Sequence, residues 1–433
     1  MNRLSKKTWL TVILFGLIGQ IAWAIENNEF NLFLFNHIGG TTGDIATMVA
    51  WSAVIATLTT LVMGTVSDRI GHRKLFLCGG YIFWGISTMA FSLISRENVA
   101  KFTEPAKVVS TAAFLVVLMD CVMTFFGSTA NDAAFNSWVT ESTNENNRTK
   151  VEGVLNAFPL LAMLIVVGAS NILIEMTGWP VYFIAIGAVV ILCGIAGFFF
   201  VEDTKPVVNK EQESFFRTLL YGFRPQVIRE NRLFYTALLA LCIYNSATQI
   251  FMPYLFIYLN KTLGFDTLTY SAVMAVVVLF ASIIAILFSG KIDSFGRKKA
   301  MNAAILIYAA GLLLAGIVRS PLLFTIIGSL MMTGFVAVSV ILMSTIRDYT
   351  PAEHVGMFQG IRLLAYVLIP MVIGPNIGNA IIHALSSGTY INDYGEMVDL
   401  PVAQVFFAAA LGVLLIYLPS HYLFRKKQNE PVK

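Results

Sequence analysis

The chain has 433 residues, of which 57% are hydrophobic and only 12% are charged, and its formal net charge is +4. A soluble domain is about one quarter charged, so this chain has too little polar surface to cover a water-soluble globule. The composition excludes a soluble enzyme, a nucleic-acid-binding domain and a disordered chain, and it indicates a polytopic membrane protein.

Twelve apolar runs are each long enough to form a membrane-spanning helix, which needs about 20 residues. The first run is too long for a signal peptide and lacks a clear cleavage site, so we expect a retained first helix. The runs are continuous rather than alternating, which favours helices over a β-barrel. The predicted spans are residues 9–36, 43–66, 75–95, 108–140, 151–175, 179–201, 233–260, 267–289, 300–318, 321–346, 356–385 and 401–424.

Lysine and arginine are unevenly distributed between the loops. With the N-terminus inside, most of the 29 basic residues fall in inner segments. The positive-inside rule therefore predicts that both termini are cytoplasmic and that the chain is a multi-pass protein of the cell membrane. The outer segments hold only Arg96, Lys101, Lys107, Lys261 and Arg319.

The widest gap between spans is residues 202–232, and its second half alternates Phe, Leu and Tyr with Arg. This pattern predicts a linker that lies partly as an amphipathic segment on the inner membrane face. The gap divides the chain into six spans at 1–201 and six at 233–424, followed by a tail at 425–433.

The two halves contain echoes of one another after corresponding spans. An Asp-x-x-Gly element with a basic cluster follows span two at Asp68 and span eight at Asp293. Gly permits a tight turn, and the Asp can bind a helix N-terminus or a nearby Arg, which would hold two helices together. A single copy could be an ordinary basic inner loop, but two copies at matching places favour a structural motif. A second echo pairs Glu141 after span four with Asp348 after span ten.

Twelve spans, a central loop and the sequence Gly64-Thr-Val-Ser-Asp-Arg-Ile-Gly-His-Arg-Lys74 together resemble the major facilitator superfamily. The resemblance implies an all-α membrane protein with two six-helix bundles and alternating access by rocking. The second copy of the loop departs from the pattern, with Ser289 and Ser294 in place of Gly and Arg. The implied gating residues are Gly64, Asp68, Arg69, Gly71, Arg73, Asp293, Gly296 and Arg297.

Span four carries so many polar groups that it must line a cavity rather than face lipid. Its stretch Asp132-Ala-Ala-Phe-Asn-Ser-Trp-Val139, followed by Thr143, is similar to the fourth helix of the glycoside–pentoside–hexuronide cation symporters. In that family the Asp contacts both sugar and cation, which makes Asp132 the leading site residue. The alternative is an Asp that caps a helix kink. Asp120, in the same span, lines the cavity or forms a local hydrogen bond.

One departure from that symporter family concerns the coupling cation. The family has two carboxylates on its second helix, and the corresponding positions here are Ala56 and Thr60. This departure puts the family's sodium site in doubt. A proton needs only one titratable group, and Asp132 or Glu26 could supply it. Uniport stays open.

Further candidates lie on spans one, seven and eleven, where amide and aromatic side chains suit the hydroxyls and C–H faces of a sugar. Glu26 and Glu29 lie past the midpoint of span one, and each could instead reach water at the outer interface. The predicted substrate-binding residues are Gln20, Trp23, Asn27, Asp132, Asn136, Trp138, Tyr244, Asn245, Gln249, Arg362 and Tyr366. The predicted cation-coupling residues are Asp132, Glu26 and Asp120.

Arg362 lies inside a span, so it needs a partner. We favour a structural pairing with a carboxylate such as Asp348; the alternative is contact with an anionic substrate.

The sequence therefore predicts a secondary transporter that takes up a sugar or glycoside with a cation. The alternative on the same fold is proton-coupled drug efflux, but the Arg-x-x-x-Gly and Gly-Pro motifs of such antiporters do not occur in spans four and five. No catalytic set or P-loop is present, so neither an enzyme nor an ATP-driven pump is indicated. We expect no cofactor, metal or nucleic-acid partner; a proton or possibly sodium ion as partner; and a monomer.

Overall fold

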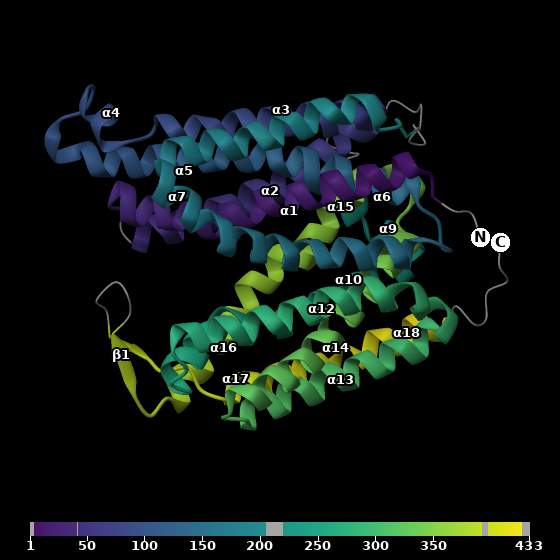
Figure 1. The fold of residues 1–433 in the computed structure, drawn as a ribbon. Helices are drawn as coiled ribbons and strands as arrows, with labels where there is room; N and C mark the ends of the chain where they lie inside the picture. Colours follow the sequence, from purple (N-terminus) through teal and green to yellow (C-terminus); the bar gives the residue numbers. More distant parts are fainter. Residues whose placement is uncertain (1–3, 41, 205–219, 392–396, 427–433) are drawn as a thin grey trace. The chain divides into compact units, whose positions relative to one another are not determined.

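A computed structural model of the chain describes residues 4–40, 42–204, 220–391 and 397–426 (Figure 1). Within these residues, eleven helices are long and apolar enough to cross a membrane, and a shorter apolar helix covers Leu268–Ile284. That shorter helix lies where the eighth span is predicted. The chain is an all-helical membrane protein.

The chain forms two compact units. Unit 1 comprises Met1–Asn144, Leu161–Val227 and Pro351–Leu363, and unit 2 comprises Glu145–Leu160, Ile228–Thr350 and Leu364–Lys433. Residues 145–160 come from the first half of the chain but pack in unit 2, and residues 351–363 come from the second half but pack in unit 1. The predicted division into halves at residues 202–232 stays a prediction.

Unit 1 is built around long helices from the first half of the chain, among which α3 lies along α5 (Figure 1). Its elements are α1 (Lys6–Leu32), η1 (Phe33–Ile38), α2 (Thr42–Ile70), α3 (Arg73–Ala90), η2 (Phe91–Leu93), α4 (Arg96–Ala100), η3 (Pro105–Lys107), α5 (Val108–Gly127), η4 (Ser128–Phe135), α6 (Asn136–Ser142), most of α7 (Arg148–Phe200), η5 (Tyr221–Phe223) and α15 (Val355–Leu363).

Unit 2 is built around α13, which packs against both α14 and α17 (Figure 1). Its elements are the start of α7, α10 (Arg232–Phe251), η6 (Met252–Tyr254), α11 (Leu255–Ile257), η7 (Tyr258–Thr262), α12 (Thr267–Phe295), α13 (Arg297–Ile317), α14 (Pro321–Tyr349), η9 (Leu364–Leu368), α16 (Ile369–Leu385), β1 (Thr389–Ile391), β2 (Met397–Asp399), α17 (Gln404–Leu415) and α18 (Tyr417–Lys426). Strands β1 and β2 pair antiparallel, with Tyr390 opposite Val398.

Two short elements stand where the chain passes from one unit to the other: α9 (Pro225–Glu230), which runs across Val227, and η8 (Ala352–His354), which begins the unit 1 segment that ends at Leu363. The predicted amphipathic segment falls largely on residues 205–219, which lie outside the described residues. Its described remainder is η5 and α9.

Element α7 consists of two helices, the predicted fifth and sixth spans, which follow one another directly. A kink at Gly178, whose backbone has φ 80° and ψ 166°, separates them. These values lie far from helical geometry and in a region that only glycine adopts readily. The break falls between the predicted ends at residues 175 and 179.

Several spanning helices contain a π-helical stretch, in which the backbone widens by one residue. The stretches η4 and η9 lie within the fourth and eleventh predicted spans. π-Helical turns occur frequently at functional sites because they redirect side chains within a helix. Asp132 lies in η4 and Tyr366 in η9, so both predicted site residues lie at such turns.

Candidate functional site

Three helices of unit 1 bring a hydrogen-bonded carboxyl cluster together. The Ser52 hydroxyl of α2 donates to Oε1 of Glu26 on α1 at 2.6 Å. The Thr124 hydroxyl of α5 donates to the same oxygen at 3.0 Å. The two hydroxyl oxygens are 2.9 Å apart. Glu26 is buried, so the alternative that its carboxylate reaches water at the outer interface does not hold.

Asp120 is the second carboxyl of this cluster, one helical turn before Thr124 on α5. It is buried, and its charge and that of Glu26 act on one another. In the described structure, Oε2 of Glu26 and Oδ1 of Asp120 are buried atoms without a hydrogen-bond partner. Two buried acids that interact in this way cannot both ionise without a large free-energy cost. The cluster is therefore suited to bind a proton or another small cation.

Asp132 lies in η4 with a hydroxyl donor on its own helix. Ser128 donates to Oδ2 of Asp132 at 2.9 Å. The side-chain amide of Asn136 donates to the backbone carbonyl of Asn131 at 3.0 Å, and that of Asn131 donates to the Tyr81 hydroxyl at 2.8 Å. Asp132 and Asn136 are half-buried. Both side chains stay partly accessible on a polar stretch of the helix.

Arg362 has a hydrogen-bond partner on its own helix. It lies on α15 in unit 1, is buried, and its Nε donates to Oε1 of Gln359 at 2.8 Å. Its charge also acts on Asp132. Asp348 pairs with Arg148 and Arg297 within unit 2. The predicted pair of Arg362 with Asp348 would join the two units, and it stays a prediction.

The predicted residues of span one spread over buried and exposed positions of α1. The Trp23 ring packs against Trp84 with centroids 4.9 Å apart, and Gln20 is half-buried. Asn27 is exposed, and its amide donates to the Trp23 carbonyl at 2.7 Å. Glu29 is buried, with only 4% of its surface exposed, so the reading that it reaches water does not hold.

Trp138 has the contacts of a packing residue. It is buried, and its indole N–H donates to the carbonyl of Glu202 at 2.8 Å. The ring also stacks with Phe135. Because its one polar group already donates to the backbone, the Trp138 side chain has no donor left for a substrate.

The predicted residues of unit 2 lie on α10 and η9. Tyr244 is buried, and its hydroxyl donates to the Phe335 carbonyl at 3.0 Å. Asn245 is half-buried and donates to the Leu241 carbonyl at 3.1 Å. Gln249 is half-buried, and Tyr366 is 36% exposed. Asn245, Gln249 and Tyr366 are therefore the more accessible members of this set.

The loop motif that follows Gly64 forms a dense set of contacts in unit 1. Asp68, at the end of α2, accepts hydrogen bonds from the backbone N–H groups of Gly356 at 2.8 Å and Met357 at 3.0 Å. These N–H groups belong to the first turn of α15, where a negative charge is stabilising. Asp68 also pairs with Arg73, whose guanidinium reaches Glu141 at 2.7 Å. The structure thus confirms both interactions predicted for this Asp.

The turns of both motif copies need glycine. Gly71 has φ 76° and Gly296 has φ 90°, a region that residues with a Cβ rarely adopt. The side chain of Asp293 lies outside the described residues, so its role in the second copy stays a prediction. Arg69 is exposed, at the end of α2.

Unit 2 contains an ionic arrangement that corresponds to the Arg73–Glu141 pair. Arg297, after the second turn, pairs with Asp348 at the end of α14, and Arg148 of α7 lies 3.0 Å from the same carboxylate. Arg347 and Glu152 form a second pair with both side chains buried. Glu141 and Asp348 follow corresponding spans in the two halves of the sequence, and each pairs with the arginine of its own loop motif.

Sequence reasoning missed Ser52, Thr124 and the Glu152–Arg347 pair. Serine and threonine are common in spanning helices, where they bond their own backbone, so Ser52 and Thr124 carry no distinctive signal. Ser339, which donates to Oδ1 of Asn156 at 2.5 Å in unit 2, escapes notice for the same reason. No group of three or more His, Cys, Asp or Glu among the described residues could hold a metal ion.

The contact between α2 and α15 leads to a testable prediction about Gly64. A Cβ at this position would lie 2.1 Å from the carbonyl oxygen of Gly356. Gly64→Ala is therefore expected to force the helices apart and to lower the free energy of unfolding by about 1–3 kcal/mol. Thermal unfolding in detergent can be followed with a thiol-reactive dye, because Cys78 and Cys193 are buried in the folded chain.

The matched control is Gly79→Ala on α3, where an added Cβ meets nothing within 4 Å. This variant should unfold at the wild-type temperature or slightly above it, since alanine favours a helix more than glycine does. Equal melting temperatures for both variants would contradict the close α2–α15 contact.

The apolar helices, the buried carboxyl cluster and the paired loop motifs define a membrane carrier with internal repeats. The family model described as Major Facilitator Superfamily matches residues 8–292 and again residues 249–433. The chain therefore belongs to the major facilitator superfamily, a family of transporters rather than enzymes. A search of the curated proteins finds no significant match to this chain.

Solved structures with the same fold carry different cargoes. The chain is similar to the human organic anion transporter MFSD10 (TETRAN), at 17% identity and a TM-score of 0.68 over 96% of this chain and 99% of that one. It is similar to a bacterial homologue of the iron transporter ferroportin, at 12% identity and 0.71 over 99% and 100%. It is similar to the proton:xylose symporter XylE, at 15% identity and 0.62 over 94% and 92%. At these identities the likeness concerns the fold alone.

Proposed function

We propose that this transporter takes up a sugar or glycoside together with a proton, by alternating access. The observation that supports proton coupling is the buried Glu26, which accepts from the hydroxyls of Ser52 and Thr124 and lies close enough to the buried Asp120 for their charges to interact. An acid in this environment is stable when protonated and becomes costly when ionised. Proton release is then favourable only when the conformation changes and water or a cation reaches the group.

The proposed substrate residues offer the chemistry that a sugar needs. In unit 1 they are Gln20, Trp23, Asn27, Asp132 and Asn136, with Arg362 acting on Asp132. In unit 2 they are Tyr244, Asn245, Gln249 and Tyr366. Carboxylate and amide groups bind hydroxyls, and aromatic rings cover the C–H faces of the sugar. Asp132 then takes part in binding both the sugar and the proton, because its charge also interacts with that of Glu26.

The loop motifs would control which side of the membrane is open. Asp68 joins the end of α2 to the start of α15, and Asp348 joins α7, α13 and α14. Opening at these contacts requires that buried ion pairs separate, so the motifs set the free energy of the closed state. With the N-terminus inside, as the loop charges predict, these contacts lie on the cytoplasmic side.

The experiment that tests the coupling site uses Glu26→Gln in proteoliposomes. Glutamine is close to a permanently protonated glutamate in size and charge. The variant is therefore expected to exchange labelled for unlabelled substrate at near the wild-type rate, yet to lose accumulation driven by a proton gradient. Exchange needs no proton release, whereas accumulation does.

Glu97→Gln provides the control, because Glu97 is an exposed carboxylate of the same unit on α4. It should keep both activities. Accumulation by Glu26→Gln at the wild-type level would remove Glu26 from the coupling site, and accumulation by neither wild type nor variant would indicate uniport. Extrusion of amphipathic dyes instead of sugar uptake would favour proton-coupled efflux.

A further inference from the structure

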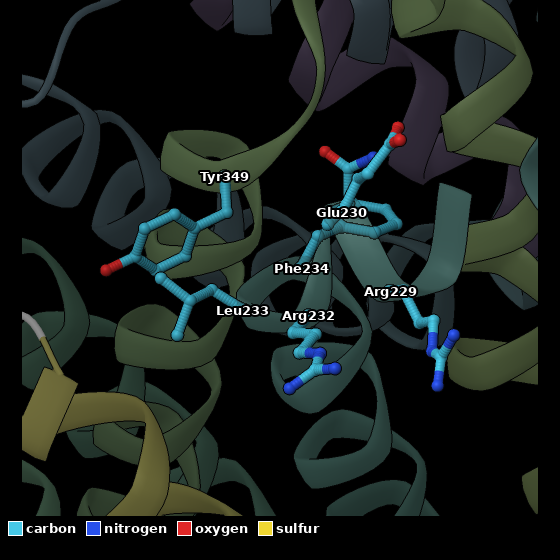
Figure 2. Close-up of a pocket in the computed structure, with 7 residues that line it drawn as sticks. Arg229, Glu230, Arg232, Leu233, Phe234 and Tyr349 are labelled. Carbon is cyan, nitrogen blue, oxygen red and sulfur yellow. The ribbon is translucent and has the colours of Figure 1, made fainter. Parts of the chain in front are cut away.

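A small cavity lies in unit 2 at the start of α10, and none of its lining residues is among those proposed to bind substrate or cation (Figure 2). Its volume is about 230 Å³, which is below the range of about 300–1,000 Å³ typical of sites for small organic molecules. It is therefore small for a site that encloses a whole organic molecule, and it is large enough for one polar group. Its lining consists of Arg229, Glu230, Asn231, Arg232, Leu233, Phe234 and Tyr349.

The cavity lies at a membrane interface. Arg232 is the first residue of α10 and of the apolar span Arg232–Thr262. Tyr349, which lines the other side, is the last residue of the span formed by α14. Ends of spanning helices lie at the depth of the lipid headgroups, where Tyr and Arg are enriched. The group that reaches this cavity from the bilayer is therefore a headgroup.

The charge of the cavity selects an anion. Figure 2 shows the guanidinium groups of Arg229 and Arg232 pointing to the same side, whereas the carboxylate of Glu230 points to the opposite side. Both arginines are exposed, so they are accessible to a ligand. Arginine binds phosphate through two parallel N–H donors, which gives both attraction and fixed geometry.

The backbone adds to this preference, since α10 begins here. Asn231 is the residue directly before the helix, and the N-terminal end of a helix carries a partial positive charge. The first N–H groups of a helix favour a negative group. Beside them, Leu233 and the ring of Tyr349 lie next to one another in Figure 2 and offer an apolar wall. This combination suits a phosphate that carries apolar chains better than a free ion.

We propose that this cavity binds the phosphate group of an anionic phospholipid headgroup. Basic pockets beside spanning helices hold such headgroups through the same combination of charge and apolar contact. The site is independent of the proposed substrate and coupling ion, so it stands or fails separately from the transport function. Bound lipid would join α9, α10 and the end of α14, which all contribute to the cavity.

The test is native mass spectrometry of the full-length detergent-solubilised protein, titrated with phosphatidylglycerol or with phosphatidylcholine of the same acyl chains. Wild type should retain phosphatidylglycerol in preference. The double variant Arg229→Gln/Arg232→Gln should lose at least about tenfold of that preference, because it removes the charged hydrogen bonds from the arginines to the phosphate, each of which contributes about that much. Inorganic phosphate forms a third arm that separates a lipid headgroup from a free anion.

The matched control is Lys298→Gln/Lys299→Gln, which removes the same charge at the start of another span, Arg297–Ile317. It should retain the wild-type preference. Arg229→Lys/Arg232→Lys keeps the charge and should lose only part of the preference, which guards against misfolding of the glutamine variant. Equal loss in the control, no preference in wild type, or displacement of lipid by inorganic phosphate at matched concentration would each overturn the proposal.

Discussion

Asp132→Asn is expected to abolish both substrate exchange and substrate accumulation, with expression and folding unchanged. Asp132 lies in the π-helical turn η4, accepts from Ser128 at 2.9 Å and interacts with the charges of Glu26 and Arg362. Asparagine keeps the size of the side chain but removes the negative charge. Arg362 then loses the attraction of one nearby negative charge, and a substrate hydroxyl loses a strong acceptor, which costs about 1.5–3 kcal/mol for a hydrogen bond to a charged group.

The measurement is the rate of exchange and the steady-state accumulation in proteoliposomes, compared with Asp266→Asn. Asp266 is an exposed aspartate before α12, so its variant should transport as wild type does. A difference between Asp132→Asn and Glu26→Gln is also expected, because the former should lose exchange and the latter should keep it. Normal accumulation by Asp132→Asn would end the assignment of Asp132 to the site.

Asp68→Ala is expected to lower the free energy of unfolding by about 3–5 kcal/mol, since it breaks a buried ion pair by removal of one partner. Two backbone N–H groups of α15 lose their acceptor, and Arg73, which is completely buried, loses one of its two carboxylate partners. The same change should weaken the α2–α15 contact and slow transport, because the closed state of this end becomes less stable.

Thermal unfolding with a thiol-reactive dye measures the first effect, and uptake at saturating substrate measures the second. Asp203→Asn is the control at the same end of unit 1. Asp203 is more exposed, and its partners are His72 and the backbone N–H of Lys74, so its loss should cost less than about 1 kcal/mol. Similar melting temperatures for the two variants would contradict the role given to Asp68.

The sequence predicts this fold well because a membrane protein must satisfy simple constraints. Every spanning helix needs a long apolar run, and the described helices follow the predicted spans. The break in α7 falls where a glycine separates two such runs, and the turns at Gly71 and Gly296 have the positive φ that the repeated motif predicts. Periodicity and length are local properties, so they can be read without knowledge of the packing.

The site is predicted less completely, because it depends on which helices pack together. Arg362 illustrates this: α15 packs with unit 1, and its Nε donates to Gln359 one turn earlier on the same helix, a contact that residue type alone does not predict. Ser52 and Thr124 acquire their importance only because they face Glu26 across two helix interfaces. Trp138 has the residue type of a sugar site, but its indole N–H is used by the backbone.

Uptake by the purified protein in proteoliposomes tests the central claim most directly. Labelled mono- and disaccharides would be offered with an imposed proton gradient, then a sodium gradient, then no gradient. We predict that one sugar accumulates under the proton gradient, and that it only equilibrates under the sodium gradient or with no gradient. Accumulation driven by sodium alone, or no transport of any sugar under any condition, would contradict proton-coupled sugar uptake.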